Sequence, residues 1–262
     1  MLVAFLMALH PGAMRGLKNK RVVVTGGASG IGAATSARFL EEGSAVAILD
    51  RDAPGLDTMR SRYQDIRGFV ADVTHRDQVN QVFAAIVGEL GGVDVVINNA
   101  GISIRHKFLE ITPDEWDKVL AVNLTGVFHV AQVAALHMMN AGGGVILNMA
   151  STNGMVGYPY YADYNTSKAG VIGLTRSMAL ELAPKVRVNA VAPGYVLTPM
   201  QRVEYSDEML NAVNQKIPLE RHAQPEEVAA LFAFLASDDA AYLNGHVYVI
   251  DGAETAGGLA SR

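Results

Sequence analysis

The sequence predicts one α/β domain, in which a doubly wound parallel sheet has helices on both faces. Two observations support this fold class. From Arg21 onward, short runs rich in valine and isoleucine alternate with longer amphipathic runs, which is typical of parallel strands joined by right-handed helical crossovers. The 262 residues are half apolar, so the chain can bury a large core, and no linker or repeat divides it.

The predicted strands do not alternate strictly between apolar and polar residues. That pattern is expected for strands that are buried on both faces of a sheet. They lie at residues 21–25, 45–49, 67–71, 93–97, 144–149, 186–191 and 246–250.

The predicted helices lie between these strands, and two begin with a clear start signal. Thr112 is a capping residue that is followed by Pro113 and by two acids in the first turn. Gln224 is likewise followed by proline and two acids. The helices are expected at residues 30–42, 54–63, 75–90, 113–140, 161–183 and 224–236.

Three segments fall outside this alternation. Residues 1–14 are expected to form a disordered extension before a domain at 15–262, and Met14 is a plausible alternative start. The apolar stretch at 1–9 is shorter than the roughly 20 residues that span a bilayer, and it lacks the charged region of a signal peptide. Residues 199–216 have no strong core pattern and are expected to form a mobile lid. The glycine-rich tail receives no role.

Composition excludes several classes of function. The chain has no cysteine, so disulfides and cysteine-ligated metal sites are impossible. Its 21 basic and 26 acidic residues give a net charge of −5, which offers no electrostatic basis for binding nucleic acid. We therefore expect a cytoplasmic protein with no metal, nucleic acid or membrane partner.

A glycine-rich turn, TGGASGIG at residues 25–32, joins the first strand to the first helix. A pyrophosphate binds the N–H groups at a helix N-terminus, and a Cβ atom there would hold it away. Gly26, Gly30 and Gly32 would remove that obstacle in a Rossmann-type dinucleotide site. Because their spacing is not G-x-G-x-x-G, a purely structural tight turn is the alternative.

Acidic residues follow the second and third strands. Asp50, which comes 18 residues after Gly32, would accept hydrogen bonds from ribose hydroxyls and repel a 2′-phosphate, so it favours NAD over NADP. The neighbouring Arg51 is the one feature that favours NADP. Asp72 and Val73 are placed to meet the adenine ring, although a helix cap is an equally good role for Asp72.

Tyr164 and Lys168 are four residues apart and therefore share one face of the predicted helix at 161–183. A nearby ammonium group would lower the pKa of the phenol and make it a general acid and base near neutral pH. An ordinary exposed pair is the alternative. Ser151 follows the strand at 144–149, at the sheet edge where open α/β sheets bind ligands. Asn123 is a polar residue inside a helix, which needs a partner if it is buried.

These motifs, in this order, resemble those of the short-chain dehydrogenase/reductase family in its single-domain form. The similarity runs from about residue 17 to residue 252. The matching segments are TGGASGIG at 25–32, DV at 72–73, NNAG at 98–101, Asn123, Ser151, YNTSK at 164–168 and PGYVLT at 193–198.

The resemblance implies a role for each of these residues. Tyr164 would be the proton donor and acceptor, Ser151 would bind the substrate oxygen, and Lys168 would hold the nicotinamide ribose. Asn123 would hold a water molecule in a proton relay to Lys168, and Thr198 would meet the carboxamide. The expected cofactor contacts are Gly26, Ser29, Gly30, Ile31, Gly32, Asp50, Arg51, Asp72, Val73, Asn99, Ala100, Gly101, Tyr164, Lys168, Pro193, Gly194, Val196 and Thr198.

The substrate pocket is expected to be lined by segments 103–106, 153–161 and 195–216. Arg105 and His106 would bind a substrate carboxylate or remain solvated loop residues, and solvation is the more common case. The nearby tyrosines would bind a hydroxylated substrate or pack on an apolar one. The candidate substrate contacts are Ser103, Arg105, Asn153, Tyr158, Tyr161 and Tyr195.

The expected function is the NAD-dependent interconversion of a secondary alcohol and a ketone. A polyol, a sugar acid or another small secondary alcohol is the expected substrate, and a 3-oxoacyl thioester is the alternative. The Ser–Tyr–x₃–Lys set disfavours a non-catalytic dinucleotide-binding protein and a methyltransferase. The resemblance also implies a homotetramer or a homodimer that assembles through the helices at 113–140 and 161–183.

Overall fold

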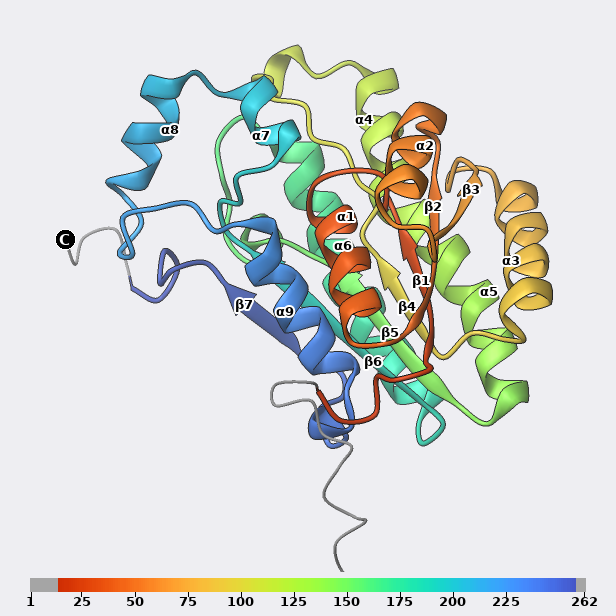
Figure 1. Ribbon diagram of the computed structural model, residues 1–262. Coiled ribbons are helices and arrows are strands. Elements are labelled where there is room, and N and C mark those ends of the chain that lie inside the picture. Colours follow the sequence, from red (N-terminus) through yellow and green to blue (C-terminus); the bar gives the residue numbers. More distant parts are fainter. Residues whose placement is uncertain (1–13, 258–262) are drawn as a thin grey trace, which may run out of the picture.

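Seven parallel strands form one sheet in the order β3-β2-β1-β4-β5-β6-β7 (Figure 1). The structure is a computed structural model that describes residues 14–257. The predicted fold class is confirmed, because the crossovers place helices on both faces of this sheet. The strands are β1 (Arg21–Thr25), β2 (Ala45–Asp50), β3 (Arg67–Val70), β4 (Val95–Asn98), β5 (Gly144–Met149), β6 (Val186–Pro193) and β7 (Val247–Ile250).

Each central strand contributes side chains to both faces of the sheet. Val22 and Val24 of β1 belong to one apolar core cluster, while Val23 between them belongs to another. This arrangement explains why the strands read as continuous apolar runs. Strand β4 starts two residues later than predicted because Asp94 is bound to the backbone N–H and the guanidinium group of Arg21, at 2.8 Å in each case.

Two groups of helices cover the two faces. Side chains of α1, α2 and α9 pack in the first core cluster, and those of α3, α5 and α6 pack in the second (Figure 1). The helices of these groups are α1 (Gly30–Glu41), α2 (Ala53–Arg62), α3 (Arg76–Leu90), α5 (Gly126–Ala141), α6 (Ala162–Leu182) and α9 (Pro225–Ala236).

The single helix predicted at 113–140 is interrupted. Helix α4 (Pro113–Leu120) starts with the expected cap, in which the Thr112 hydroxyl accepts the N–H of Glu115 and the Glu115 carboxylate accepts that of Thr112. A π-helical turn at Ala121–Thr125 then separates it from α5. The stretch 113–141 is long and apolar enough to cross a membrane, but 56% of its most apolar window is buried in the protein, as in a core helix.

The segment 199–216 holds two short helices, α7 (Pro199–Glu204) and α8 (Asp207–Asn214). Thr198 and Ser206 cap them, and Leu210 and Val213 are the buried residues of α8. The segment is therefore packed as well as helical, and its action as a lid remains a prediction. Of the predicted N-terminal extension, residues 1–13 lie outside the described part, as do residues 258–262 of the tail.

Candidate active site

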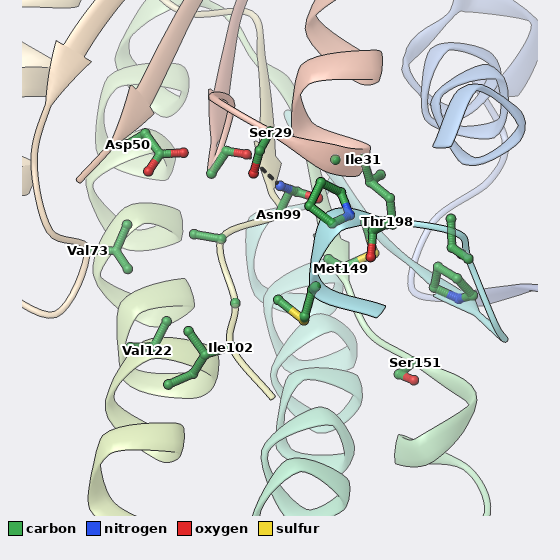
Figure 2. Close-up of a pocket in the computed structure, with 18 of the residues that line it drawn as sticks. Ser29, Ile31, Asp50, Val73, Asn99, Ile102, Val122, Met149, Ser151 and Thr198 are labelled. Atoms are coloured by element: carbon green, nitrogen blue, oxygen red, sulfur yellow. Dashed lines mark hydrogen bonds between the residues drawn. The ribbon is translucent and has the colours of Figure 1, made fainter. Parts of the chain in front are cut away.

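A pocket of about 300 Å³ lies at the carboxyl ends of the central strands. The glycine turn, the ends of β2 and β5, and the start of α7 all contribute to its wall. Figure 2 shows Asp50 and Ser151 on opposite sides of this pocket, with Ser29, Asn99 and Thr198 between them. All the residues expected from the sequence to contact a cofactor line it, except Gly32, the last residue of the glycine turn.

The glycine turn is shaped to receive a phosphate group. Gly26 and Gly30 have positive φ angles of 64° and 52°. A Cβ atom on Gly32 would collide with the carbonyl oxygen of Gly26. The Ser29 side chain makes no capping hydrogen bond to α1, so the N–H groups of the first turn of α1 are not capped by it. These features fit a dinucleotide pyrophosphate.

Asn99 holds this turn from the neighbouring strand. Its side-chain amide donates to the carbonyl oxygen of Thr25 at 3.0 Å and to that of Gly26 at 3.1 Å, and Figure 2 draws the second of these bonds. The Thr25 hydroxyl in turn accepts the backbone N–H groups of Asn99 and Ala100, each at 3.1 Å. Besides its expected contact with the cofactor, Asn99 therefore fixes the shape of the glycine turn.

Asp50 lies at the end of the pocket where an adenosine ribose would bind. One carboxylate oxygen accepts the N–H of Ala28 at 3.0 Å, and the other accepts that of Asp52 at 3.0 Å. Because a carboxylate offers about four lone-pair sites, each oxygen can accept a further hydrogen bond from a ribose hydroxyl. The two backbone bonds hold the negative charge in place there.

Asp72 does not cap α3, whose N-cap is His75. Its carboxylate accepts the backbone N–H and the hydroxyl of Thr74, at 2.9 and 2.8 Å. Burial opposes ionisation, but these two bonds, and after them the charges of His75 and Arg51, hold the pKa of Asp72 below its usual value. The local sequence left the two roles open, and the structure places Asp72 in the pocket wall.

Asn123 is fully buried inside the π-helical turn. Its side chain accepts the N–H of Ile102 at 2.8 Å and donates to the carbonyl oxygen of Ile102 at 2.9 Å. The wide turn presents the amide to this loop in a way that a regular helix would not. A Cβ atom on Gly101 would lie 3.3 Å from Asn123 Oδ1 and 3.6 Å from Lys168 Nζ, so both groups lie close to Gly101.

Ser151, Tyr164 and Lys168 meet at the other end of the pocket. Lys168 is 2% exposed, and its ammonium nitrogen donates to the carbonyl oxygen of Met149 at 2.8 Å. The same nitrogen lies 5.5 Å from the centre of the Tyr164 ring. The i,i+4 pair is therefore part of the pocket, and the alternative of an exposed surface pair is ruled out.

The pKa shifts of Tyr164 and Lys168 differ from what their i,i+4 spacing predicts. Burial raises the pKa of Tyr164 to about 12, against a smaller lowering by the hydrogen bond with Ser151, and the charge of Glu204 raises it further. Burial also lowers the pKa of Lys168 to about 8. The expected net lowering of the Tyr164 pKa by Lys168 is wrong, because desolvation of both groups dominates.

The candidate substrate residues form a cluster beside the pocket. The Tyr158 hydroxyl donates to Glu254 at 2.7 Å, and the Tyr161 hydroxyl donates to Glu204 at 3.0 Å. The Tyr195 ring meets that of Tyr158 edge to face, with the ring centres 6.4 Å apart. We call Tyr158, Tyr161, Tyr195, Tyr205, Glu204 and Glu254 the tyrosine–glutamate cluster.

The cluster borders the pocket at two points. The Tyr161 ring is edge to face with that of Tyr164, with the ring centres 6.3 Å apart. One oxygen of Glu254 lies 2.9 Å from the position that a Cβ atom of Gly194 would take. Asn153 lies beside Ser151, whose hydroxyl donates to Asn153 Oδ1 at 3.3 Å, and the Asn153 amide donates to Asn165 at 2.7 Å. Ser103 does not line the pocket, and Arg105 lies over the Tyr160 ring.

Sequence reasoning missed Glu204 and Glu254. Neither lies in a motif, and each reaches the cluster from a segment far from Tyr158 and Tyr161 in the chain. Among the described residues, one buried oxygen of each glutamate has no hydrogen-bond partner. The start signal of α7, with Thr198 followed by Pro199, was the one local indication that this segment is ordered. Over residues 14–257, no group of three His, Asp or Glu side chains could hold a metal.

Comparisons with known proteins agree with this arrangement. A family model described as enoyl-(acyl carrier protein) reductase matches residues 26–253. The chain is 41% identical to a 3-oxoacyl-[acyl-carrier-protein] reductase of Thermotoga maritima, over 90% of this chain and 98% of that protein. It is 37% identical to the D-threitol dehydrogenase of Mycolicibacterium smegmatis, over 91% and 94%.

A solved structure is similar over the same span. The ligand-free aldohexose dehydrogenase of Thermoplasma acidophilum superposes with a TM-score of 0.87 at 32% identity, covering 94% of this chain and 98% of that one. The matched family, the relatives and this shared fold all extend over nearly the whole chain. The protein therefore belongs to the short-chain dehydrogenase/reductase family, whose members are NAD(P)-dependent oxidoreductases that act on alcohol and carbonyl groups.

Proposed function

We propose that the protein uses NAD to interconvert a secondary alcohol and a ketone on a small neutral polyol or sugar. One observation carries the proposal: a single pocket brings together the glycine turn, Asp50 and the set of Ser151, Tyr164 and Lys168. The dinucleotide site and a proton-transferring phenol therefore share one cleft.

The cofactor would be held by groups at both ends of the pocket. The glycine turn would take the pyrophosphate, and the Asp50 carboxylate would accept hydrogen bonds from the ribose hydroxyls. A 2′-phosphate at the same place would meet a fixed negative charge, which supports NAD as the cofactor. When bound, the nicotinamide ring would accept or supply the hydride.

The chain's own residues would manage the proton. The Tyr164 phenolate would remove the hydroxyl proton of an alcohol, and the phenol would return it to a ketone. Ser151 would donate a hydrogen bond to the reacting oxygen, and the ammonium group of Lys168 would stabilise the phenolate. Asn123 would hold a water molecule in a proton relay to Lys168, and the position of both residues close to Gly101 supports this role.

The tyrosine–glutamate cluster supports a neutral, hydroxylated substrate. Its phenols and carboxylates can accept and donate hydrogen bonds to several hydroxyl groups. Its two glutamates would repel the carboxylate of a sugar acid. The Thermotoga maritima relative favours a 3-oxoacyl thioester as the second candidate, and the Mycolicibacterium smegmatis relative favours a polyol.

The cofactor preference is tested with Asp50→Ala. We expect the KM for NAD to rise about tenfold or more, the equivalent of one charge-assisted hydrogen bond or better. The KM for NADP should change little or fall. An unchanged ratio of the two KM values would contradict the assignment of Asp50 to the ribose.

The substrate class is tested by following nicotinamide absorbance with a panel of compounds. Neutral polyols and aldoses should be oxidised with NAD, sugar acids of the same length should be poorer, and 3-oxoacyl thioesters should be reduced poorly. A strong preference for the thioester with NADPH would favour the second candidate. The cytoplasmic location and the assembly into a homotetramer or homodimer remain predictions.

A further inference from the structure

A buried carboxylate stands directly before the candidate catalytic tyrosine. Asp163 is 0% exposed and lies in the first turn of α6. Burial of an ionised carboxylate costs several kcal/mol unless the charge is paired and hydrogen-bonded, on the order of the penalties known for single ions. Asp163 does not line the pocket, so contact with a ligand does not offset the free-energy cost of burying its carboxylate.

Both oxygens of Asp163 have a specific partner. Oδ1 accepts the backbone N–H of Tyr164 at 2.7 Å. Oδ2 lies 3.0 Å from Nε2 of His106, whose side chain is only 9% exposed. The carboxylate therefore ties the backbone of Tyr164 to a side chain from the loop that follows β4.

His106 fixes that loop at further points. Its backbone N–H donates to the carbonyl oxygen of Tyr160 at 3.1 Å. The guanidinium group of Arg105 lies 4.3 Å from the centre of the Tyr160 ring. The other ring nitrogen of His106 is buried, and its nearest acidic group is Glu115, at 3.8 Å. The loop is thereby attached to the segment that leads into α6.

The same loop is anchored to Asn123 at its other end. Ile102, four residues before His106, exchanges two hydrogen bonds with the Asn123 side chain. Residues 99–102 line the cofactor pocket, whereas His106 lies beyond it. The loop thus spans from the cofactor wall to the first turn of the catalytic helix and is held at both ends by buried polar groups.

We propose that Asp163 and His106 are a positioning pair that sets the placement of Tyr164 relative to the cofactor wall. Proton and hydride transfer need the reacting atoms about 3–3.5 Å apart, and a misplacement of about 1 Å can cost about 10²-fold in rate. The pair acts on the backbone of Tyr164 and not on the reacting atoms. The inference rests on the proposed role of Tyr164 as acid and base.

The test compares Asp163→Ala, His106→Ala, His106→Gln and the double alanine variant. We expect kcat to fall about 10- to 100-fold in each alanine variant, while the KM for NAD stays within about twofold, because only the placement of Tyr164 changes. The glutamine amide can reach Asp163 as the imidazole does, so His106→Gln should recover most of the activity. The double variant should be no worse than the poorer single one.

Hydrogen exchange supplies a readout that needs no substrate. Amides of residues 101–107 and 160–166 should exchange faster in Asp163→Ala and His106→Ala, and at the native rate in His106→Gln. Lys107→Ala is the matched control, since its side chain forms an exposed pair with Glu110 in the same loop. It should leave both readouts unchanged.

Two results would overturn the proposal. One is a folded Asp163→Ala protein with native kcat. The other is a pair of alanine variants whose effects add independently. Failure of the proposed function is a separate outcome, because it would appear as full activity in Tyr164→Phe.

Discussion

Tyr164 and Lys168 show how one buried site sets the behaviour of two ionisable residues. Desolvation raises the pKa of the phenol to about 12 and lowers that of the ammonium group to about 8. Burial therefore favours the protonated phenol at neutral pH. Positive charge beside the phenol, from the Lys168 ammonium group and from an oxidised nicotinamide when bound, would favour the phenolate. Alcohol oxidation should accordingly speed up as the pH rises.

Glu204 offers a residue-level test of this electrostatic account. Its charge raises the pKa of Tyr164, after the larger effect of burial. In Glu204→Gln the phenol loses this opposing charge, so its pKa should fall. The pH at which kcat for alcohol oxidation reaches half its maximum should then shift downward. The profile is measured from about pH 6 to about pH 10, which spans the reference pKa values of His and Tyr.

Glu208→Gln is the matched control for this prediction. Glu208 belongs to the neighbouring helix α8 and its side chain is exposed, so the pH profile should not move. An upward shift, or no shift, in Glu204→Gln would contradict the account.

At the scale of elements, the glycine turn leaves no room for a side chain at Gly32. A Cβ atom on Gly32 would collide with the carbonyl oxygen of Gly26 and with the Asn99 amide, which itself holds the turn. Gly32→Ala should therefore weaken NAD binding by about tenfold or more, the equivalent of about 1.4 kcal/mol, in a fluorescence titration.

Gly88 in α3 provides the control, because a Cβ atom there would meet open space. Gly88→Ala should leave NAD affinity unchanged and raise the free energy of unfolding by about 0.5–1 kcal/mol through helix propensity. If both variants bind NAD as well as the native protein does, the turn is not the pyrophosphate site.

The elements themselves could be predicted to different extents. The strands and most helices follow from burial on both faces of the sheet and from start signals such as Thr112. The break at 121–125 could not be predicted, since the apolar pattern continues through it and the turn coincides with bonds of Asn123 to a distant loop. The helices α7 and α8 were missed because two turns carry too short a pattern.

At the scale of the whole molecule, the strand order brings the predicted site together. Residues at the carboxyl ends of parallel strands must meet at one edge, so Asp50, Asn99 and Ser151 could be assigned from the sequence. Glu204, Glu254 and the partners His106 and Asp163 could not. They meet only through tertiary packing, and no local motif marks them.

Assembly into an oligomer is the whole-molecule prediction. Leu136 of α5 and Leu180 of α6 are 60% and 83% exposed, which is unusual for large apolar side chains on two neighbouring helices. We expect light scattering to give a multiple of the 27.9 kDa chain mass, with four copies, and Leu180→Arg to reduce it. A native protein that is a monomer at micromolar concentration would contradict the prediction.

The central claim is that Tyr164 transfers the proton while NAD exchanges the hydride. The most direct measurement compares NAD reduction with a neutral polyol in the native protein, in Tyr164→Phe and in Tyr242→Phe, whose ring is fully exposed. The account predicts that Tyr164→Phe lowers kcat by about 10²–10⁴-fold with native NAD affinity, and that Tyr242→Phe has no effect. Near-native turnover in Tyr164→Phe would contradict it.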